Sequence, residues 1–347
     1  MHIESFKEVI NACRFCFMCR HLSAAANARF RESDAPRGRA LIADAVRMDP
    51  GRLAESDFAD AFYDSDLSGA NRFHCVSGYD EIGLQLAFRR DLVDAGREPE
   101  RVKALSEELR GTARWIVEGK GDALYFIDPA TAARPASVDA LARVARAGGV
   151  PLATVRGGCI GKGLAVLGYA DAAKEAMARF AQVVNAAGAK TLVVSNPAAY
   201  DALAVDFPAN GAILKPAVLH ASAFMAGLAR DGAVRFAAKP EPISYLESDY
   251  LRNYARCDGP GEFFRALGLA TRPFGTNNEE SYTAGEGALA LDRLNPGLAR
   301  KLAERVAGLA EEGVRVATAS AWTARVLAEA GLATVTLEEL AGERLCS

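Results

Sequence analysis

The sequence predicts a mixed protein of the α+β or α/β class, in which a helical N-terminal domain precedes two duplicated α/β units. Three observations support this fold class. The first part of the chain has helical patterns and loops, apolar runs typical of buried strands begin only after Gly121, and two later segments repeat one order of turns, helices and strands. The chain has 347 residues, half of them hydrophobic, which is enough for two or three compact units. We therefore expect domains at 1–120, 121–235 and 236–347.

The N-terminal domain, 1–120, is expected to be helical. The segment "PRGRALIADAVR" starts with Pro36, a residue favoured in the first turn of a helix, and continues with apolar residues at helical spacing. The segment "DEIGLQLAFRRDLVDAG", residues 80–96, has an acidic start and a glycine at its end, as helices often do. A further helix is predicted over about 98–119, and short helices and loops over 49–75.

The second domain begins with "DALYFID", a short and nearly continuous apolar run that is typical of a buried strand. Helical and strand patterns then alternate through "PLATV" and "KTLVVS", which predicts a parallel sheet. The segment 161–203 and the segment 285–327 share a Gly-x-Gly turn, a long helix, a strand and another helix. We interpret 121–235 and 236–347 as duplicated units, which are expected to pack about a pseudo-twofold axis with a site at their seam.

Composition excludes several classes of function. The net charge is −3 and basic residues are not clustered, so no nucleic-acid partner is expected. The sequence lacks a run of about 18 apolar residues and its N-terminus lacks a signal-peptide core, so we expect no transmembrane segment and a cytoplasmic location. Disulfides are rare in that compartment. The seven cysteines are therefore buried small residues, reactive thiols or metal ligands.

Three of these cysteines form the run Cys13, Cys16 and Cys19 within "NACRFCFMCRHLS". A short loop with this spacing offers three thiolates to one cubane iron–sulfur cluster. A bacterial ferredoxin run continues with a fourth cysteine, which ligates the other cluster of a two-cluster protein. That position is Ser23.

The same spacing can be applied backwards from Cys75, taken as the last cysteine of a second run. The three preceding ligand positions are then Ser65, Ser68 and Asn71. One cluster would keep all four thiols, and the other would have none, because its positions hold Ser23, Ser65, Ser68 and Asn71. The sequence therefore predicts one [4Fe–4S] cluster whose irons are bound by Cys13, Cys16, Cys19 and Cys75.

Two alternatives to this cluster remain open at this point. The cysteines could bind zinc, with His21 and His74 nearby, or Cys75 could be a buried core residue and the run could bind no metal. If a cluster is present, the flanking side chains are expected to shield it and to tune its potential through burial. These flanking residues are Arg14, Phe15, Phe17 and Met18.

With these motifs, the chain resembles over essentially its whole length a family of iron–sulfur electron-transfer proteins. Examples are the iron–sulfur subunits of glycolate oxidase and of anaerobic glycerol-3-phosphate dehydrogenase, and heterodisulfide reductase B/D-type proteins. The resemblance depends on the triple-cysteine run, on "ESDAPRGRALIADAV", on Cys75 followed by "DEIGLQLAFRRDLVDAG", and on the duplicated units. It implies a ferredoxin-like domain followed by two cysteine-rich "CCG" domains.

The sequence departs from the family in the CCG motifs. The family has a Cys-Cys-Gly before the long helix and a Cys-Pro-x-Cys after the next strand. The first unit keeps only Cys159, and the other thiol positions of the two units hold Gly158, Ser195, Ala198, Tyr282, Thr283, Ser320 and Thr323. The family's Asp-Pro-Cys-His is replaced by "ESDY", residues 247–250. We therefore expect degenerate CCG-like units without the second cofactor, and no heterodisulfide reduction.

Other candidate residues have structural interpretations. The turn "RGGCIGKG" lacks the full phosphate-loop pattern, so we favour a tight structural turn over a nucleotide or flavin phosphate site. Cys159 is interpreted as a relic of the family motif and not as a nucleophile. His220, Cys257 and Cys346 are expected to be structural, and we assign no catalytic residue.

The predicted function is electron transfer within an oxidoreductase complex. The resemblance implies a partner subunit that holds a flavin and acts as the dehydrogenase, and this chain would relay electrons through its single cluster. The acceptor would be an electron-transfer flavoprotein or a membrane quinone system, which allows peripheral attachment at the inner membrane face. Two alternatives are an enzyme or ligand-binding subunit that uses the α/β repeats around a structural cluster, and a purely structural assembly subunit.

Overall fold

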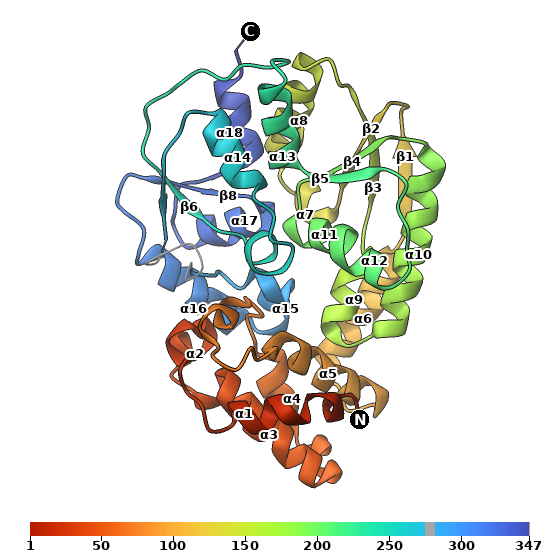
Figure 1. Cartoon of the computed structure of the whole chain (residues 1–347), viewed down its shortest axis with the longest axis vertical. Helices are drawn as coiled ribbons and strands as arrows, with labels where there is room; N and C mark the ends of the chain where they lie inside the picture. The colour runs from red at the N-terminus through yellow and green to blue at the C-terminus, as the bar shows by residue number, and fades with distance from the viewer. Residues whose placement is uncertain (275–281, 347) are drawn as a thin grey trace.

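The computed structural model describes residues 1–274 and 282–346. It has a helical N-terminal part, drawn at the bottom of Figure 1, and two α/β units that stand side by side above it. The mixed α/β class and the two sheets agree with the prediction. Within the described ranges, no helix combines the length and the apolar character that crossing a membrane requires.

The N-terminal part packs short helices around one apolar core. Its α-helices are α1 (Lys7–Cys13), α2 (Ala24–Arg29), α3 (Pro36–Met48), α4 (Ser56–Tyr63), α5 (Glu81–Asp94) and α6 (Glu100–Thr112), with the 3₁₀ turns η1 (His2–Phe6), η2 (Arg20–Leu22), η3 (Glu32–Asp34), η4 (Pro50–Ala54) and η5 (Ala70–His74) between them. Phe62 and Phe88 stack in this core, with ring centroids 3.7 Å apart. A Cβ atom on Gly38 would clash with the carbonyl oxygen of Glu32, so this close approach of α3 to η3 requires glycine.

The first α/β unit contains a five-stranded sheet with the order β1-β3-β2-β4-β5. Its strands are β1 (Trp115–Glu118), β2 (Ala123–Ile127), β3 (Leu152–Gly157), β4 (Thr191–Val194) and β5 (Ala217–His220). All pairs are parallel except β1 with β3. The helix expected over 98–119 ends at Thr112 in the structure, because the aromatic and β-branched run "WIV" pairs with β3 as an edge strand.

Helices cover both faces of this sheet. They are α7 (Pro129–Ala132), α8 (Pro135–Ala147), α9 (Lys162–Leu167), α10 (Ala170–Ala187), α11 (Pro197–Asp201), the π-helical turn η6 (Ala202–Asp206), α12 (Phe207–Ala209) and α13 (Ala221–Arg230). Asn196 begins α11, because its side chain accepts hydrogen bonds from the N–H groups of Ala198 and Ala199.

The second unit repeats the topology of the first. Its strands β6 (Ile243–Leu246), β7 (Thr271–Pro273), β8 (Arg315–Thr318) and β9 (Thr334–Thr336) form a parallel sheet with the order β7-β6-β8-β9, which matches β3-β2-β4-β5 of the first unit. Its helical elements are the π-helical turn η7 (Tyr250–Tyr254), α14 (Gly259–Ala266), the 3₁₀ turn η8 (Glu286–Ala288), α15 (Leu291–Leu294), α16 (Pro296–Ala307), α17 (Ala321–Glu329) and α18 (Leu337–Arg344).

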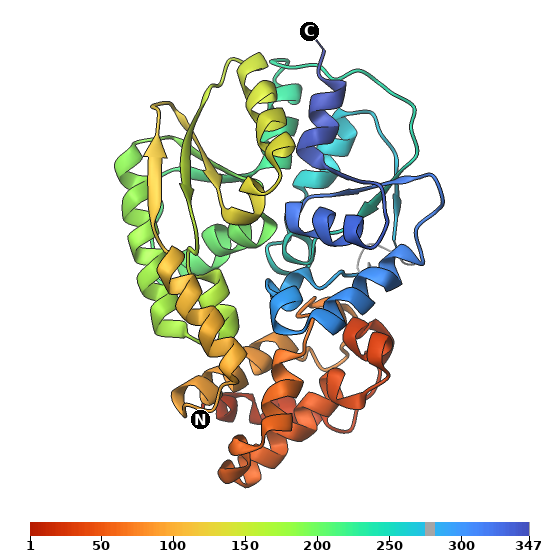
Figure 2. The same ribbon diagram turned by 180° about the vertical axis from the view of Figure 1, so that it is seen from behind.

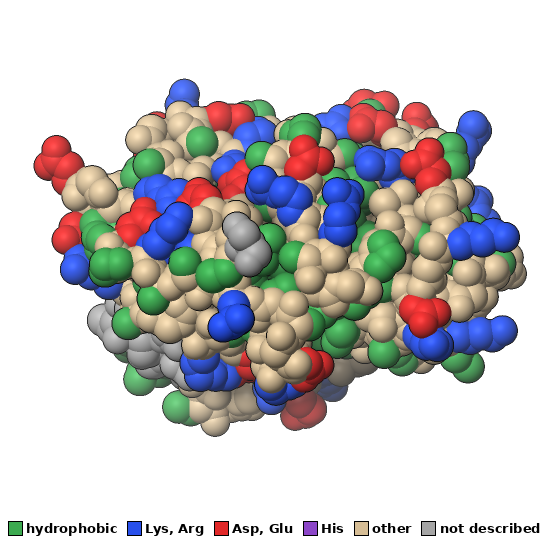
Figure 3. Space-filling model, turned by 90° about the horizontal axis from the view of Figure 1, so that it is seen from above, with side chains coloured by type: hydrophobic (Ala, Val, Ile, Leu, Met, Phe, Trp, Pro, Cys, Tyr) green, Lys and Arg blue, Asp and Glu red, His purple; other side chains and the backbone are tan. Residues whose placement is uncertain are grey.

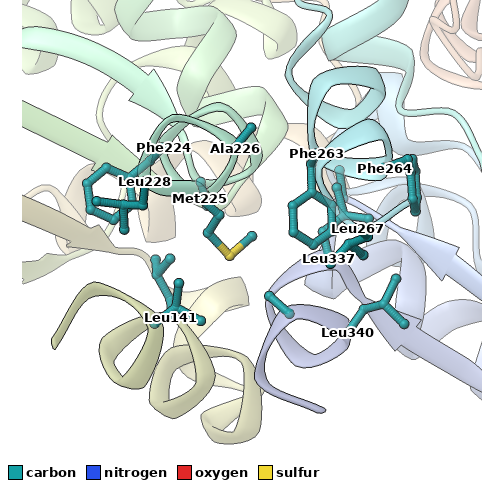
Figure 4. Close-up of a cluster of buried hydrophobic side chains, with 14 of the residues drawn as sticks. Leu141, Phe224, Met225, Ala226, Leu228, Phe263, Phe264, Leu267, Leu337 and Leu340 are labelled. Carbon is teal, nitrogen blue, oxygen red and sulfur yellow. The ribbon is translucent and has the colours of Figure 1, made fainter. Parts of the chain in front are cut away.

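The two units share one hydrophobic core at their seam. Helix α13 packs on α14, and α8 packs on α18, so each pair joins one helix from each unit. The view from behind shows α8 and α18 next to each other (Figure 2). Met225 of α13 points into this core, with Leu141 of α8 on one side and Phe263 of α14 on the other (Figure 4). Because α8 corresponds to α14 and α13 to α18, the seam has the pseudo-twofold arrangement expected of a duplication.

The N-terminal part contacts both α/β units. Helices α5 and α6 pack on α9 of the first unit, and α2 packs on α16 of the second. The fully buried Arg89 of α5 donates hydrogen bonds to the carbonyl oxygens of Phe62 and Val166. On the face of the α/β units seen from above, acidic and basic side chains are interspersed (Figure 3). That face therefore lacks the concentrated positive charge of a nucleic-acid interface.

Candidate metal centre

The four predicted ligands meet at one small cavity in the N-terminal part. Cys13 is the last residue of α1, Cys16 and Cys19 lie on the following loop, and Cys75 comes directly after η5. All four line the cavity, and its remaining wall is formed by Met18, Ser77 and Tyr79. The chain therefore brings together the three consecutive cysteines and the distant one.

Consecutive turns shape the loop that carries the first three cysteines. The N–H of Cys16 donates to the carbonyl oxygen of Cys13 at 2.9 Å, and the N–H of Arg20 donates to Phe17 at 3.0 Å. The Arg14 guanidinium pairs with Asp44 of α3 and anchors the loop to the helical core. These turns place the side chains at every third residue near one another.

A turn also positions Cys75. The N–H of Gly78 donates to the Cys75 carbonyl oxygen at 3.1 Å, and Gly78 has a positive φ of 62° that favours glycine. The N–H of Tyr79 donates to the Cys75 sulfur at 3.0 Å. Hydrogen bonds from N–H groups to ligand sulfurs are one of the means by which proteins tune iron–sulfur clusters.

Burial favours the protonated form of two of the thiols, Cys13 and Cys19, when no metal is bound. Desolvation raises the pKa of the Cys13 thiol well above its ordinary value, and the negative charges of Cys19 and Glu81 raise it further. Desolvation followed by the charge of Glu81 raises the pKa of Cys19 to about 12. These thiols become thiolates when a bound metal supplies the compensating positive charge.

Four thiolates are a donor set that both a zinc ion and a cubane cluster use. Within 1–274 and 282–346, no three His, Cys, Asp or Glu side chains are placed to hold one metal ion. A single zinc ion, with Zn–S distances near 2.3 Å, would need four sulfurs about 3.8 Å apart. A cubane binds each thiolate to a different iron, so its four ligands surround a larger body. The four thiols that line the cavity supply the number of ligands that a cubane requires.

The volume of the cavity limits this fit. It measures about 20 Å³, which is space for about one water molecule. A cluster would therefore require the loop 14–18 to lie further out. This loop forms the exposed side of the site, and such a shift would have to accommodate the pairing of Arg14 with Asp44 of α3.

The flanking aromatic residues do not shield the cavity as expected. Phe15 is 75% exposed and Phe17 is 70% exposed, because their side chains point outward from the turns. Met18 is also largely exposed, although it lines the cavity, and Val76 on the other side is 80% exposed. The apolar residues thus form a rim around the four cysteines. We call Phe15, Phe17, Met18 and Val76 the rim patch.

The zinc alternative receives no support from the histidines. His21 does not line the cysteine cavity, and its Nδ1 lies 3.0 Å from the carbonyl oxygen of Met18. The side chain of His74 lies outside the described part of the structure.

The four residues at the positions of a second ferredoxin-type ligand set, Ser23, Ser65, Ser68 and Asn71, are buried within a hydrogen-bonded segment. Ser23 donates to the carbonyl oxygen of Asp34, and Asn71 donates to Glu81 at 2.7 Å. Ser65 accepts the N–H of Leu67, and the carboxylate of Asp66 accepts the N–H groups of Ala25 and Ser68. A carboxylate thus accepts backbone hydrogen bonds where the predicted second cluster would have lain.

The same segment is joined to the second α/β unit. Tyr254 donates its hydroxyl to the carbonyl oxygen of Leu67, and Asn253 donates to Ser68 at 2.7 Å. Both residues belong to the π-helical turn η7. The segment 65–71 therefore connects two parts of the chain.

Cys159 lies in the turn between β3 and α9. The N–H of Gly161 lies 3.4 Å from its sulfur, and the N–H groups of Gly163 and Leu164 also point toward it. Desolvation raises the pKa of this thiol, which is the opposite of what activates a nucleophile. These N–H groups are directed at the sulfur, so they are not available to bind a phosphate in this turn. A Cβ atom on Gly158 would lie 2.5 Å from Thr112, as expected of a tight structural turn.

Three hydroxyl residues at the other positions where CCG thiols were expected form hydrogen bonds. Ser195 pairs with the hydroxyl of Tyr125 at 2.8 Å, and Ser320 caps α17. Thr283 donates to the buried Asp249 at 2.6 Å. His220 is fully buried, bonded to the Ser195 carbonyl oxygen at 3.1 Å, and burial lowers its pKa to about 4, which agrees with a structural role.

Three buried acids near these positions were not singled out from the sequence. They are Asp249, Glu286 and Glu338, and burial raises the pKa of each. Glu286 accepts the hydroxyl of Ser248 at 2.6 Å. Glu338 precedes the capping-box residue Glu339, so its place in the first turn of a helix resembles that of an ordinary exposed acid. No feature of the sequence indicates that the Glu338 side chain is buried.

Comparison of the chain with protein-family models, with curated proteins and with solved structures finds no match. The relation to iron–sulfur electron-transfer subunits therefore stays a prediction from the motifs.

Proposed function

We propose that this protein is an electron-transfer subunit with one [4Fe–4S] cluster on Cys13, Cys16, Cys19 and Cys75. The observation that carries the proposal is the meeting of these four side chains, from two distant segments, at one cavity. The cluster would supply one-electron transfer, and the chain would supply its ligands, its burial and its orientation.

The surroundings of the cavity support a relay between partners. The rim patch exposes apolar side chains next to the cysteines, and exposed apolar residues of this kind favour contact with another protein. A partner seated there would bring its cofactor close to the cluster. We propose a flavin-dependent dehydrogenase subunit as the electron donor, and an electron-transfer flavoprotein or a membrane quinone system as the acceptor.

The duplicated units would serve this relay as a scaffold. Of the positions where the resembled family has these thiols, only Cys159 is a cysteine, and the hydroxyls of Ser195 and Thr283 are hydrogen-bonded, so a second redox centre is not proposed there. We place the protein in the cytoplasm, with peripheral attachment at the inner membrane face as the variant that a quinone acceptor would require. Catalysis would belong to the partner.

Anaerobic purification tests this proposal. We expect about four irons and four sulfides per chain, and one reduced-cluster signal by electron paramagnetic resonance after dithionite treatment. Zinc without iron, or eight irons per chain, would contradict it. A cluster that cannot be reduced at accessible potentials would instead support the structural alternative.

A further inference from the structure

Two adjoining cavities lie where the three parts of the chain meet. The smaller has a volume of about 350 Å³ and the larger about 680 Å³. They share the wall residues Pro129, Ala130, Leu289, Ala290 and Arg293, so they adjoin one another. Together they have the size of an ordinary small-molecule site.

The smaller cavity is at the carboxyl edge of the first sheet. Asp128 follows β2, Gly158 follows β3 and Asn196 follows β4, and all three line it. Strand β2 lies between β3 and β4 in the sheet, so the crossovers from β2 to β3 and from β3 to β4 run in opposite directions. Open α/β sheets bind ligands in the crevice at such a switch point.

A strained residue forms part of the wall between the two cavities. Leu289 has φ 63° and ψ −51°, and the N–H of Ala290 donates to the carbonyl oxygen of Ala288 at 2.7 Å. This is the γ-turn with positive φ, which is rare and costly for a residue with a side chain. Strain of this kind is found most often at ligand sites and active sites. It holds the Leu289 side chain against both cavities.

The wall of the smaller cavity is largely apolar, with Leu105 and Leu109 of α6, Phe126 of β2, Ile160 and Val166 among its residues. Its cations are already neutralised within the described wall. Lys162 forms salt bridges with Asp201 at 2.5 Å and with Asp206 at 2.7 Å. Arg293 forms a bidentate salt bridge with Glu108. An anionic ligand would be desolvated without gaining a counter-ion, which is unfavourable.

The one acid of this wall without a cationic partner is also satisfied. Asp128 accepts the N–H of Thr131 at 2.8 Å and the amide of Asn196. A cationic ligand would therefore have to compete with hydrogen bonds that cap α7 and hold the turn after β4. Neither charge type is favoured.

We propose that the smaller cavity binds a neutral, largely apolar compound of one or two fused rings, and that the larger cavity is its mouth. The apolar walls would stabilise the ring by burial. The strained turn at Leu289 would place the side chain that closes over it. This site does not depend on a cluster at the cysteines. A negative result in the binding test would therefore leave the electron-transfer proposal standing, and the reverse also holds.

The test uses three probes with one ring system, which are neutral 2-naphthol, anionic 2-naphthoate and cationic 2-naphthylmethylamine. Titration calorimetry on the full chain at pH 7.5 should detect binding of 2-naphthol, with at least about tenfold weaker binding of both ions. Equal or tighter binding of either ion would overturn the proposed ligand class. The absence of 2-naphthol binding would overturn the site.

Substitutions locate the bound ring. Ala130 lines both cavities, whereas Ala132 lies on the same short helix, is exposed and lines neither. Ala130→Trp should weaken 2-naphthol binding by about tenfold or more, and Ala132→Trp should leave it within about twofold. Equal effects of the two substitutions, or none from Ala130→Trp, would overturn the assignment.

A measurement on the unaltered chain keeps the proposal testable if Ala130→Trp fails to fold. Nuclear Overhauser contacts from the protons of 2-naphthol should reach the methyl groups of Leu109, Ile160 and Val166. Contacts to methyl groups elsewhere, in place of these, would overturn the proposed location.

Discussion

The backbone N–H of Tyr79 donates a hydrogen bond to the sulfur of Cys75, at a distance of 3.0 Å. This contact orients the distant cysteine toward the cavity that it shares with Cys13, Cys16 and Cys19. Cys75 is therefore the residue whose removal best separates the proposed cluster from its alternatives.

We expect Cys75→Ala to lower iron from about four atoms per chain to about three or fewer after anaerobic purification, because one iron of the cubane loses its protein ligand. Colorimetric iron and sulfide analysis measures this change. Cys257→Ala is the matched control, since Cys257 lies away from the cavity, and it should keep its iron. Full iron content in Cys75→Ala would disprove the ligand assignment.

The rim patch gives a prediction about the rate of electron transfer. The double substitution Phe15→Ser and Phe17→Ser should slow reduction of the proposed cluster by the proposed flavin dehydrogenase partner by at least about tenfold, because it removes apolar contact area near the cysteines. Stopped-flow absorbance records the rate.

Stability and iron content should stay unchanged in this double variant, because both rings are exposed. Ile213→Ser is the control, since Ile213 is 76% exposed on the first α/β unit. If both variants react at the same rate as the unaltered protein, the rim patch is not the docking surface.

The backbone conformation of Phe30 predicts that a glycine at this position would increase the stability of the protein. It follows α2 with φ 57° and ψ 34°, in the left-handed region, and its side chain is 86% exposed. Phe30→Gly should therefore stabilise the protein by about 1 kcal/mol, because glycine adopts this conformation without strain. The midpoint of urea unfolding measures the effect. Leu41→Gly, at an exposed position inside α3, should have the opposite sign.

Glu338 predicts a pH-dependent difference in stability. Burial raises its pKa to about 7 in the folded protein from an ordinary value of 4.5, so the ionised form is penalised by folding. Stability is thus lost as the pH rises from about 4.5 to 7, by an amount on the order of 3 kcal/mol. Glu338→Gln cannot ionise, so it avoids this loss of stability. The stability of the variant minus that of the unaltered protein should therefore be larger at pH 8 than at pH 5.

The neighbouring Glu339 provides the control with the opposite sign. Its pKa is lowered, with hydrogen bonds from the Arg134 guanidinium and the Thr336 N–H favouring the charged form against the cost of partial burial. Its stabilising contribution is present above its unfolded pKa and is lost in acid. Glu339→Gln should therefore be less stable than the unaltered protein at pH 8, with the difference shrinking below pH 4. Chemical unfolding of both variants at several pH values measures these differences. If the free energy of unfolding depends on pH in the same way in the two variants, this account is wrong.

Much of the α/β architecture could be predicted from the sequence. The apolar runs "DALYFID", "PLATV" and "KTLVVS" contain β2, most of β3 and β4, because buried parallel strands require continuous apolar residues. Pro36 marked the start of α3. Local rules were sufficient for these elements.

Tertiary contacts decided the features that the sequence did not reveal. Residues 115–118 form β1 only because β3 offers an open edge about forty residues further along the chain. The rim patch is exposed because consecutive turns around Cys16 and Cys19 leave Phe15 and Phe17 on the outside. Glu338 is buried because α18 packs against α8 of the other unit. None of these outcomes follows from local propensity.

The shared core of Figure 4 makes the two α/β units thermodynamically interdependent. Either unit without the other would expose the apolar faces of two helices to water, so the pair should melt in a single transition and resist separation by truncation. It also gives each unit a structural role, including the unit whose expected CCG positions hold no cysteine. Its presence is required for the other half to fold, whether or not it carries any chemistry of its own.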